Sequence, residues 1–179
     1  MRLPERTGDQ IRFGISILVP PPAGPELQAA REAIGDLLAP AIPAHVTLLG
    51  PTVVETEEHD LVVEHLEQVA SRHEPFHIHL RGTGTFRPVS PVVFVQLAQG
   101  IPGCERLEAD IRSGPLAQPL RFNYHPHVTV AHEVGAEALD RAFAELAGYE
   151  AHFDVTAFQL FHHGDDGVWR PARDFTLTG

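Results

Sequence analysis

The sequence is poor in cysteine, in basic residues and in long apolar runs. Its single cysteine, Cys104, excludes an intramolecular disulfide and a cysteine-rich zinc site, which fits a reducing compartment. With 13 Lys and Arg against 24 Asp and Glu, the formal net charge is −11. The chain therefore lacks the basic surface that binding to long nucleic acids requires, whereas a small nucleotide or an RNA end needs few contacts.

No stretch approaches the roughly 20 consecutive apolar residues that span a bilayer, and residues 1–6 (MRLPER) do not resemble a signal peptide. We therefore expect a soluble, cytoplasmic protein with no membrane partner. The 179 residues are 43% hydrophobic, which is enough for one globular domain with its own core.

The pattern His-apolar-Thr-apolar occurs twice, at residues 45–48 (HVTL) and 127–130 (HVTV). In a β-strand alternate side chains point to the same face, so the His and Thr of each copy would share one face, roughly 7 Å apart. The apolar residues of each copy would then point into a core. We expect the two strands to lie side by side and to line one cleft with two imidazoles and two hydroxyls. The residues concerned are His45, Thr47, His127 and Thr129.

Hydrophobic periodicity predicts elements in an order that repeats: strand, helix, motif strand, helix, strand. In the first half it predicts strands at 11–19, 45–48 (ended by Gly50-Pro51) and 76–80, and helices at 26–38 and 55–72. In the second half it predicts strands at 92–97, 127–130, 151–160, 168–169 and 175–177, and helices at 104–113 and 136–146. Alternating elements indicate α/β layers with helices packed on sheets, and the spacing of the motifs by about half the chain indicates a duplicated lobe.

Two imidazoles in one cleft suit acid–base chemistry near neutral pH, because the ordinary pKa of histidine is about 6.5. A neutral imidazole can take a proton from a nucleophile, and a protonated one can give a proton to a leaving oxygen. Threonine hydroxyls can donate hydrogen bonds to the non-bridging oxygens of a phosphate. The set fits phosphodiester cleavage, which in principle needs no metal.

The two motifs, their separation, and the flanking residues 43–45 (PAH) and 124–127 (YHPH) resemble those of the 2H phosphoesterase superfamily. The most similar branch is the bacterial 2′-5′ RNA ligase-like or RNA 2′,3′-cyclic phosphodiesterase family. The resemblance implies an α/β (α+β) fold with two sheet-plus-helix lobes, related by a pseudo-twofold axis, around a central cleft. We expect one domain over residues 1–179, with lobes at about 1–90 and 91–179, with or without strand exchange.

The resemblance further implies metal-independent hydrolysis of a 2′,3′-cyclic phosphate on a nucleotide or an RNA terminus, with reverse 2′-5′ ligation, and no cofactor. Carried over to this chain, His45 and His127 are catalytic, and Thr47 and Thr129 bind phosphate. For hydrolysis we expect His127 to act as base to water and His45 as acid to the 3′ oxygen, which leaves a 2′-phosphate.

Four further residues are candidates for substrate binding: Phe86, Tyr124, His125 and His132. Tyr124 or Phe86 could stack on a base, and His125 would border the cleft. His132 stands where many relatives carry Arg, three residues after the second Thr, and it supplies less charge at pH 7. Together with the acidity of the chain, this favours a small cyclic phosphate over long RNA.

Two alternatives stay open at this point. The histidine pairs 77/79, 125/127 and 162/163 could serve a metal-dependent hydrolase, since neutral imidazole is a common metal ligand. Strand alternation alone also places two histidines separated by one residue on one face, and the chain has no His-Glu-x-x-His helix, so we expect no metal. The other alternative is a non-catalytic module of the same fold that binds a phosphorylated ligand. No coiled-coil pattern suggests an obligate partner, so we expect a monomer.

Overall fold

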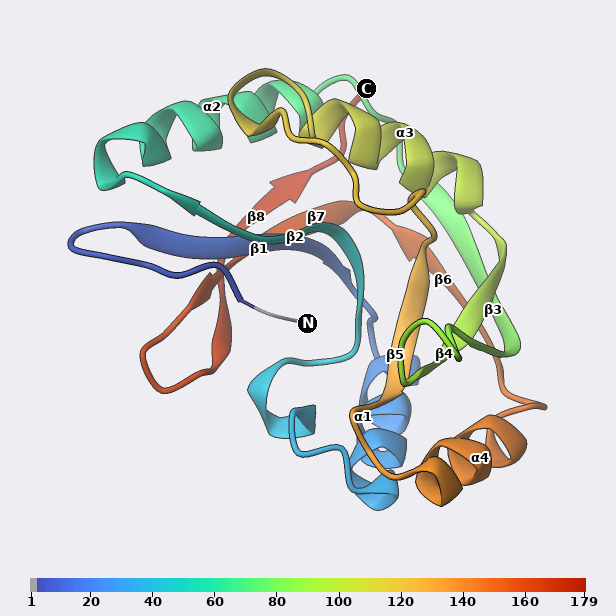
Figure 1. Ribbon diagram of the computed structural model, residues 1–179. Helices are drawn as coiled ribbons and strands as arrows, with labels where there is room; N and C mark the ends of the chain where they lie inside the picture. Colours follow the sequence, from blue (N-terminus) through green and yellow to red (C-terminus); the bar gives the residue numbers. More distant parts are fainter. Residues whose placement is uncertain (1–2) are drawn as a thin grey trace.

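The computed structural model describes residues 3–179 (Figure 1). Its strands are β1 (Ile11–Leu18), β2 (His45–Val54), β3 (Phe76–Thr85), β4 (Val92–Gln99), β5 (His127–His132), β6 (Glu150–Val155), β7 (Ala157–His163) and β8 (Trp169–Thr176). Its α-helices are α1 (Ala23–Ile34), α2 (His59–Ala70), α3 (Ile101–Ile111) and α4 (Ala136–Glu145). Short 3₁₀ turns lie at Ala39–Ala41, Thr56–Glu58 and Gly114–Leu116.

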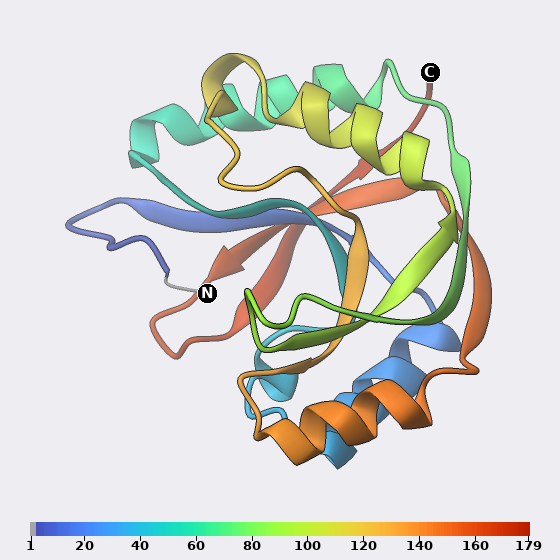
Figure 2. The same cartoon turned by 45° about the vertical axis from the view of Figure 1, so that its right-hand side comes forward.

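The strands form one curled antiparallel sheet in the order β6-β3-β4-β5-β2-β1-β7-β8. The two motif strands, β5 and β2, are neighbours at its centre. Figures 1 and 2 show α2 and α3 side by side at one end of the molecule and α1 and α4 side by side at the other. The first pair packs over β2 and β8, and the second packs against β3, β4 and β5. One hydrophobic cluster runs through both regions.

The predicted α+β architecture is confirmed, because helices pack on a sheet in which the motif strands are adjacent. The division into lobes near residue 90 stays a prediction. Within residues 3–179, no helix combines the length and the apolar character needed to cross a membrane.

Several predicted boundaries were wrong, including that of β3, which continues past residue 80 to Thr85, and two of the errors have identifiable reasons. Gly50-Pro51 does not end β2. Leu49 pairs with Ile15 and Thr52 with Phe13, so Gly50 and Pro51 together lie opposite one residue of β1 and form a bulge. A proline is tolerated there because the bulge requires no N–H from it for the hydrogen bonds of the sheet. The predicted helix at 26–38 begins at Ala23 and stops at Ile34, because Gly35 adopts φ 90° and caps it. Leu37, which continued the helical spacing, is 92% exposed.

In the C-terminal part of the chain, the hydrophobic pattern predicted one strand where the structure has two, and then two strands where the structure has one. The stretch predicted as one strand at 151–160 is two, β6 and β7, separated at Thr156 and paired with β3 and β1 respectively. The predicted strands at 168–169 and 175–177 are parts of one strand, β8, which pairs with β7 along its length.

A buried ion pair ties the end of α1 to the chain that leads into β2. The guanidinium of Arg31, 4% exposed, lies 3.1 Å from Oδ2 of Asp36, which is fully buried. Arg31 also donates from Nη1 to the carbonyl of Ile42 at 3.0 Å, and Asp36 accepts from the backbone N–H of Leu38 at 2.9 Å. Arg31 thereby fixes the segment that leads into the first motif.

We predict that Arg31→Met destabilises the fold by about 3–5 kcal/mol, because it leaves the buried Asp36 carboxylate without its cation. Urea unfolding at pH 7 measures this. The matched control is Asp140→Asn, which removes an ion pair of 2.7 Å with Arg87 in which the Asp140 side chain is 69% exposed. The control is expected to cost under about 1 kcal/mol. Equal effects of the two variants would contradict a special role for the buried pair.

Candidate active site

The two motif strands are joined at the centre of the sheet. β2 and β5 pair antiparallel, with Val46 opposite Val128, both fully buried. Because side chains alternate, the residues on either side of each valine share the other face of the sheet. This face, here called the motif face, carries His45, Thr47, His127 and Thr129, all half-buried.

Antiparallel register puts His45 opposite Thr129 and His127 opposite Thr47. The two imidazoles are therefore diagonal neighbours across the strand pair, with backbones roughly 7–8 Å apart, and the two hydroxyls occupy the other diagonal. The structure thus brings together all four residues that the motifs predicted. Their arrangement is twofold symmetric about the Val46–Val128 pair.

Both motif strands contain the same bulge directly after the threonine. In β2, Thr47 pairs with Ser16 and Leu49 with Ile15, so Leu48 is the extra residue. In β5, Thr129 pairs with Phe94 and Ala131 with Val93, so Val130 is the extra residue. The burial patterns of the two hexapeptides, 45–50 and 127–132, are identical as a result.

The bulge decides where His132 points. Simple alternation from His127 would turn His132 toward the core, but the extra residue buries both Val130 and Ala131 and returns His132 to the motif face. Its side chain is 17% exposed, and Nε2 lies 3.6 Å from Oε1 of Glu133. Burial lowers the pKa of His132, so at pH 7 it does not supply the fixed charge of an arginine.

The backbone fixes both catalytic candidates in the same way. Nδ1 of His45 lies 2.7 Å from the carbonyl oxygen of Pro43, and Nδ1 of His127 lies 2.7 Å from that of His125. A carbonyl oxygen only accepts, so each Nδ1 carries the proton and donates. Each neutral imidazole is therefore left with the lone pair of Nε2 available as a base.

Burial keeps both imidazoles neutral near pH 7. It lowers the pKa of His45 to about 4, with smaller lowering contributions from Arg31 and His127, although the hydrogen bond to Pro43 opposes the shift. Burial also lowers the pKa of His127, and the nearby His125 adds to this. An anion bound between them would reverse part of the effect, because it favours the charged form.

Two phenylalanines pack around His127. The rings of Phe86 and Phe94 lie with their centroids 4.9 and 5.0 Å from that of the imidazole, and 4.5 Å from each other. Gly84 permits this, because a Cβ there would come within 2.5 Å of the Phe94 ring. Phe94 was not predicted, since its strand is apolar on both faces and shows no alternation. His125 is exposed, with its ring 5.8 Å from that of Phe86.

Tyr124 makes a hydrogen bond to the backbone of the first motif. Its hydroxyl donates to the backbone carbonyl of Thr47 at 3.0 Å, and its ring packs against the core. Burial raises the pKa of Tyr124, so the group stays a neutral donor. The predicted contact of Tyr124 with a substrate base stays a prediction.

Arg31 is a second residue near the motif face that was not predicted. It is close enough to contribute to the lowered pKa of both His45 and His132. Its position inside an amphipathic helix gave no signal, because a lone arginine on a helix is usually solvated. Its donors are directed at Asp36 and Ile42, so it acts on His45 through its charge alone, whereas at His132 the charge of Asp36 opposes it.

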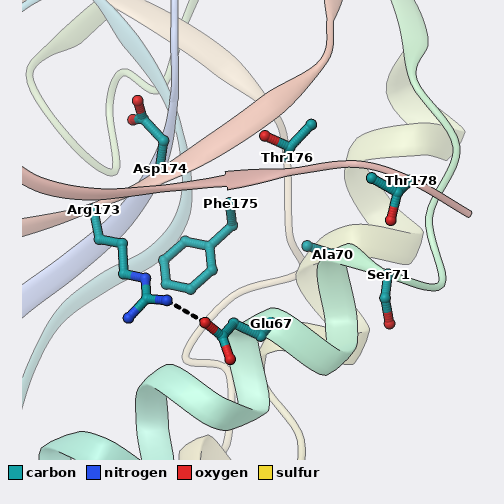
Figure 3. A pocket seen from close by; sticks show the side chains of 8 residues that line it. All are labelled: Glu67, Ala70, Ser71, Arg173, Asp174, Phe175, Thr176 and Thr178. Atoms are coloured by element: carbon teal, nitrogen blue, oxygen red, sulfur yellow. Dashed lines mark hydrogen bonds and ion pairs between the residues drawn. The ribbon is translucent and has the colours of Figure 1, made fainter.

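One hollow in the surface reaches a residue of the motif face, and another lies apart from that face. One, of about 450 Å³, is lined by His132 together with Ile34, Asp36, Leu38 and Ala138. The other, of about 210 Å³, lies between α2 and β8, where Arg173 is paired with Glu67 (Figure 3). None of the predicted site residues lines the second hollow.

Comparison of the sequence with known proteins identifies a matching family and similar bacterial proteins. The sequence profile of the 2′-5′ RNA ligase superfamily matches residues 19–167. A protein of Bacillus thuringiensis (strain Al Hakam), named "Putative phosphoesterase", is 27% identical over 140 residues, which cover 76% of this chain and 80% of that protein.

Solved structures show the same fold. E. coli LigT, crystallised with NADP+, superposes with a TM-score of 0.64 at 21% identity, over 95% of this chain and 99% of that one. TT0787 of Thermus thermophilus gives a TM-score of 0.57 at 22% identity, over 94% and 98% of the two chains. Since the profile spans most of the chain, the resemblance seen in the motifs is confirmed: the protein belongs to the 2′-5′ RNA ligase superfamily of 2H phosphoesterases, with a phosphodiesterase-type function.

Proposed function

We propose that the protein is a metal-independent phosphodiesterase that hydrolyses a 2′,3′-cyclic phosphate to a 2′-phosphate, with 2′-5′ ligation as the reverse reaction. One observation carries the proposal. Two imidazoles with the same backbone-fixed tautomer stand diagonally on one sheet face, with a threonine opposite each. This is a symmetric pair of proton-transfer groups on one face of the sheet.

In this mechanism His127 Nε2 takes a proton from water as the water oxygen bonds to phosphorus. The bond from phosphorus to the 3′ oxygen breaks, and His45 Nε2 gives its proton to that oxygen. The hydroxyls of Thr47 and Thr129 donate to the non-bridging oxygens, where negative charge grows. In ligation the two imidazoles exchange roles by microscopic reversibility.

The lowered pKa values set a requirement for the acid. With both imidazoles neutral in the free protein, one proton must be taken up before His45 can act as an acid. The bound phosphate supplies the driving force, because its negative charge raises the pKa of the imidazoles beside it. Substrate anion and catalytic proton would thus bind together.

Three facts favour a small substrate over long RNA. The net charge is −11, a histidine with a pKa lowered by burial, His132, stands where the family resemblance leads us to expect an arginine, and the donors of Arg31 are engaged with Asp36 and Ile42. Structures of E. coli LigT are described in complex with 3′-AMP, ATP and phosphate, which supports a nucleotide-sized ligand here. We propose a nucleoside cyclic phosphate or an RNA terminus as substrate, with the protein acting as a monomer and no membrane or long nucleic acid as partner.

We predict that wild-type protein hydrolyses a nucleoside 2′,3′-cyclic phosphate in excess EDTA. His45→Ala and His127→Ala should each lower kcat by about 10²–10⁴-fold, because each removes one proton-transfer step. Phosphorus NMR of the product should show a 2′-phosphate.

His162→Ala is the matched control, since His162 is also half-buried and its pKa is also lowered by burial, but it lies on β7. Its activity should be that of wild type. Activity lost with EDTA would instead favour the metal-dependent alternative. Binding of the cyclic phosphate without turnover in wild type would favour a non-catalytic module.

The pH profile of the reaction provides a separate prediction. kcat/KM reports the free protein, in which burial lowers the pKa of both imidazoles below 6.5, so the singly protonated active form is most abundant below pH 6.5. We therefore expect kcat/KM to peak below pH 6.5 and to fall as pH rises. kcat reports the complex, where the phosphate raises both pKa values, so its profile should lie at higher pH. Profiles that coincide, or a kcat/KM that rises through pH 8, would contradict this account.

A further inference from the structure

Three histidines and two carboxylates gather at the edge of the sheet, away from the four motif residues. They lie on β3 and on β6, which is the terminal strand in the sheet order. Register pairs His77 with Asp154 and His79 with His152. The strand β4 separates β3 from the motif strand β5, and His79 pairs with Gln99, at the other end of β4 from Phe94.

The side chains of this cluster converge on a common point. Nε2 of His79 lies 2.7 Å from Oε1 of Glu150, and Nε2 of His152 lies 3.9 Å from the same oxygen. The rings of His79 and His152 are stacked, with centroids 4.0 Å apart. One ligand atom from each of the three residues falls within 4.8 Å of the others.

A chain of hydrogen bonds prepares His152 as a ligand. Nδ1 of His77 lies 2.8 Å from Oδ1 of Asp154, and a carboxylate accepts, so Nδ1 carries the proton of His77. Nε2 of His77 must then accept from Nδ1 of His152, which lies 3.2 Å away. The remaining nitrogen of His152, Nε2, is left with its lone pair toward Glu150. Metal-binding histidines are commonly oriented in this way by a carboxylate behind them.

We propose that His79, Glu150 and His152 bind a divalent first-row cation of the zinc class, with water as the fourth ligand. Zinc accepts imidazole and carboxylate ligands at about 2.0–2.2 Å, so neighbouring ligand atoms of a tetrahedral site lie roughly 3.4 Å apart. The separations of 2.7 and 3.9 Å bracket this spacing. The proton that Nε2 of His79 directs at Glu150 is displaced, to Nδ1 or to solvent, when Nε2 binds the metal.

The proposal changes the expectation of no metal that follows from the sequence. Alternation indicates that His77 and His79 share a face, but it does not reveal that a strand some 70 residues later brings Glu150, His152 and Asp154 to that face. The site is independent of the proposed catalysis. Its role is structural, because a metal would join the edge strand β6 to β3.

The test uses the full chain and Zn²⁺ alone. Calorimetry should show one Zn²⁺ bound per chain, and EDTA should reverse the binding. At 100 times the Kd, Tm should rise by about 5–10 °C, because ligand bound only to the folded state stabilises it. His79→Ala and His152→Ala should each weaken Zn²⁺ binding by at least about 10-fold, and Asp154→Asn by about 10-fold or more.

The control is His162→Ala, which alters a different histidine pair, with Nε2 of His59 3.2 Å from Nε2 of His162. It should bind Zn²⁺ as wild type does. Tm in EDTA separates folding defects from metal effects, and His152, with its side chain 52% exposed, gives a variant that tolerates truncation. Zn²⁺ binding that survives unchanged in both alanine variants, or no saturable binding below about 1 mM, would overturn the proposal.

Discussion

The antiparallel pairing of β2 with β5 at Val46 and Val128 is the constraint on which the rest of the structure depends. Burial of the two valines forces the residues beside them onto the opposite face, and the direction of pairing makes the two His-Thr units twofold related. A shift of the register by one residue would turn every one of these side chains over. The core on one side of the sheet therefore determines the geometry of the site on the other.

The packing that positions the imidazoles also disfavours their protonated form, and hydrogen bonds in the site oppose part of this effect. Packing with Phe86 and Phe94 orients His127, and burial lowers its pKa. The carbonyl hydrogen bonds of Pro43 and His125 oppose this lowering, because they stabilise the protonated ring. The site is thereby neutral at rest and ready to take up a proton with an anionic ligand. Behind it, the buried pair of Arg31 and Asp36 supports the segment whose Pro43 carbonyl holds His45.

Local pattern predicted the parts of the fold that depend on alternation and periodicity. His45-Val46-Thr47 reads correctly as a strand with its valine buried, and helices α2 and α4 follow from their apolar spacing. The errors in the strands depend on register between distant strands, whereas the helix predicted to residue 38 ends earlier because of the local cap at Gly35. In the sequence, the bulges at Leu48 and Val130 are visible only as two adjacent apolar residues, which do not identify a bulge. Likewise, nothing at Thr156 indicates that the strands on either side of it, β6 and β7, lie far apart in the sheet. Arg31 and Phe94 could not be assigned to the site because their neighbours come from other elements.

The central claim is that both imidazoles act on one phosphate, and nitrogen NMR of the histidine side chains tests it most directly. Wild-type protein is titrated with a nucleoside 2′-phosphate, the product of the proposed reaction, while the pKa values of His45 and His127 are followed. We expect both to rise together on binding, from the lowered values of the free protein, and to rise less in a Thr47→Val variant. A ligand that binds while either imidazole keeps its free-protein pKa would contradict the shared site.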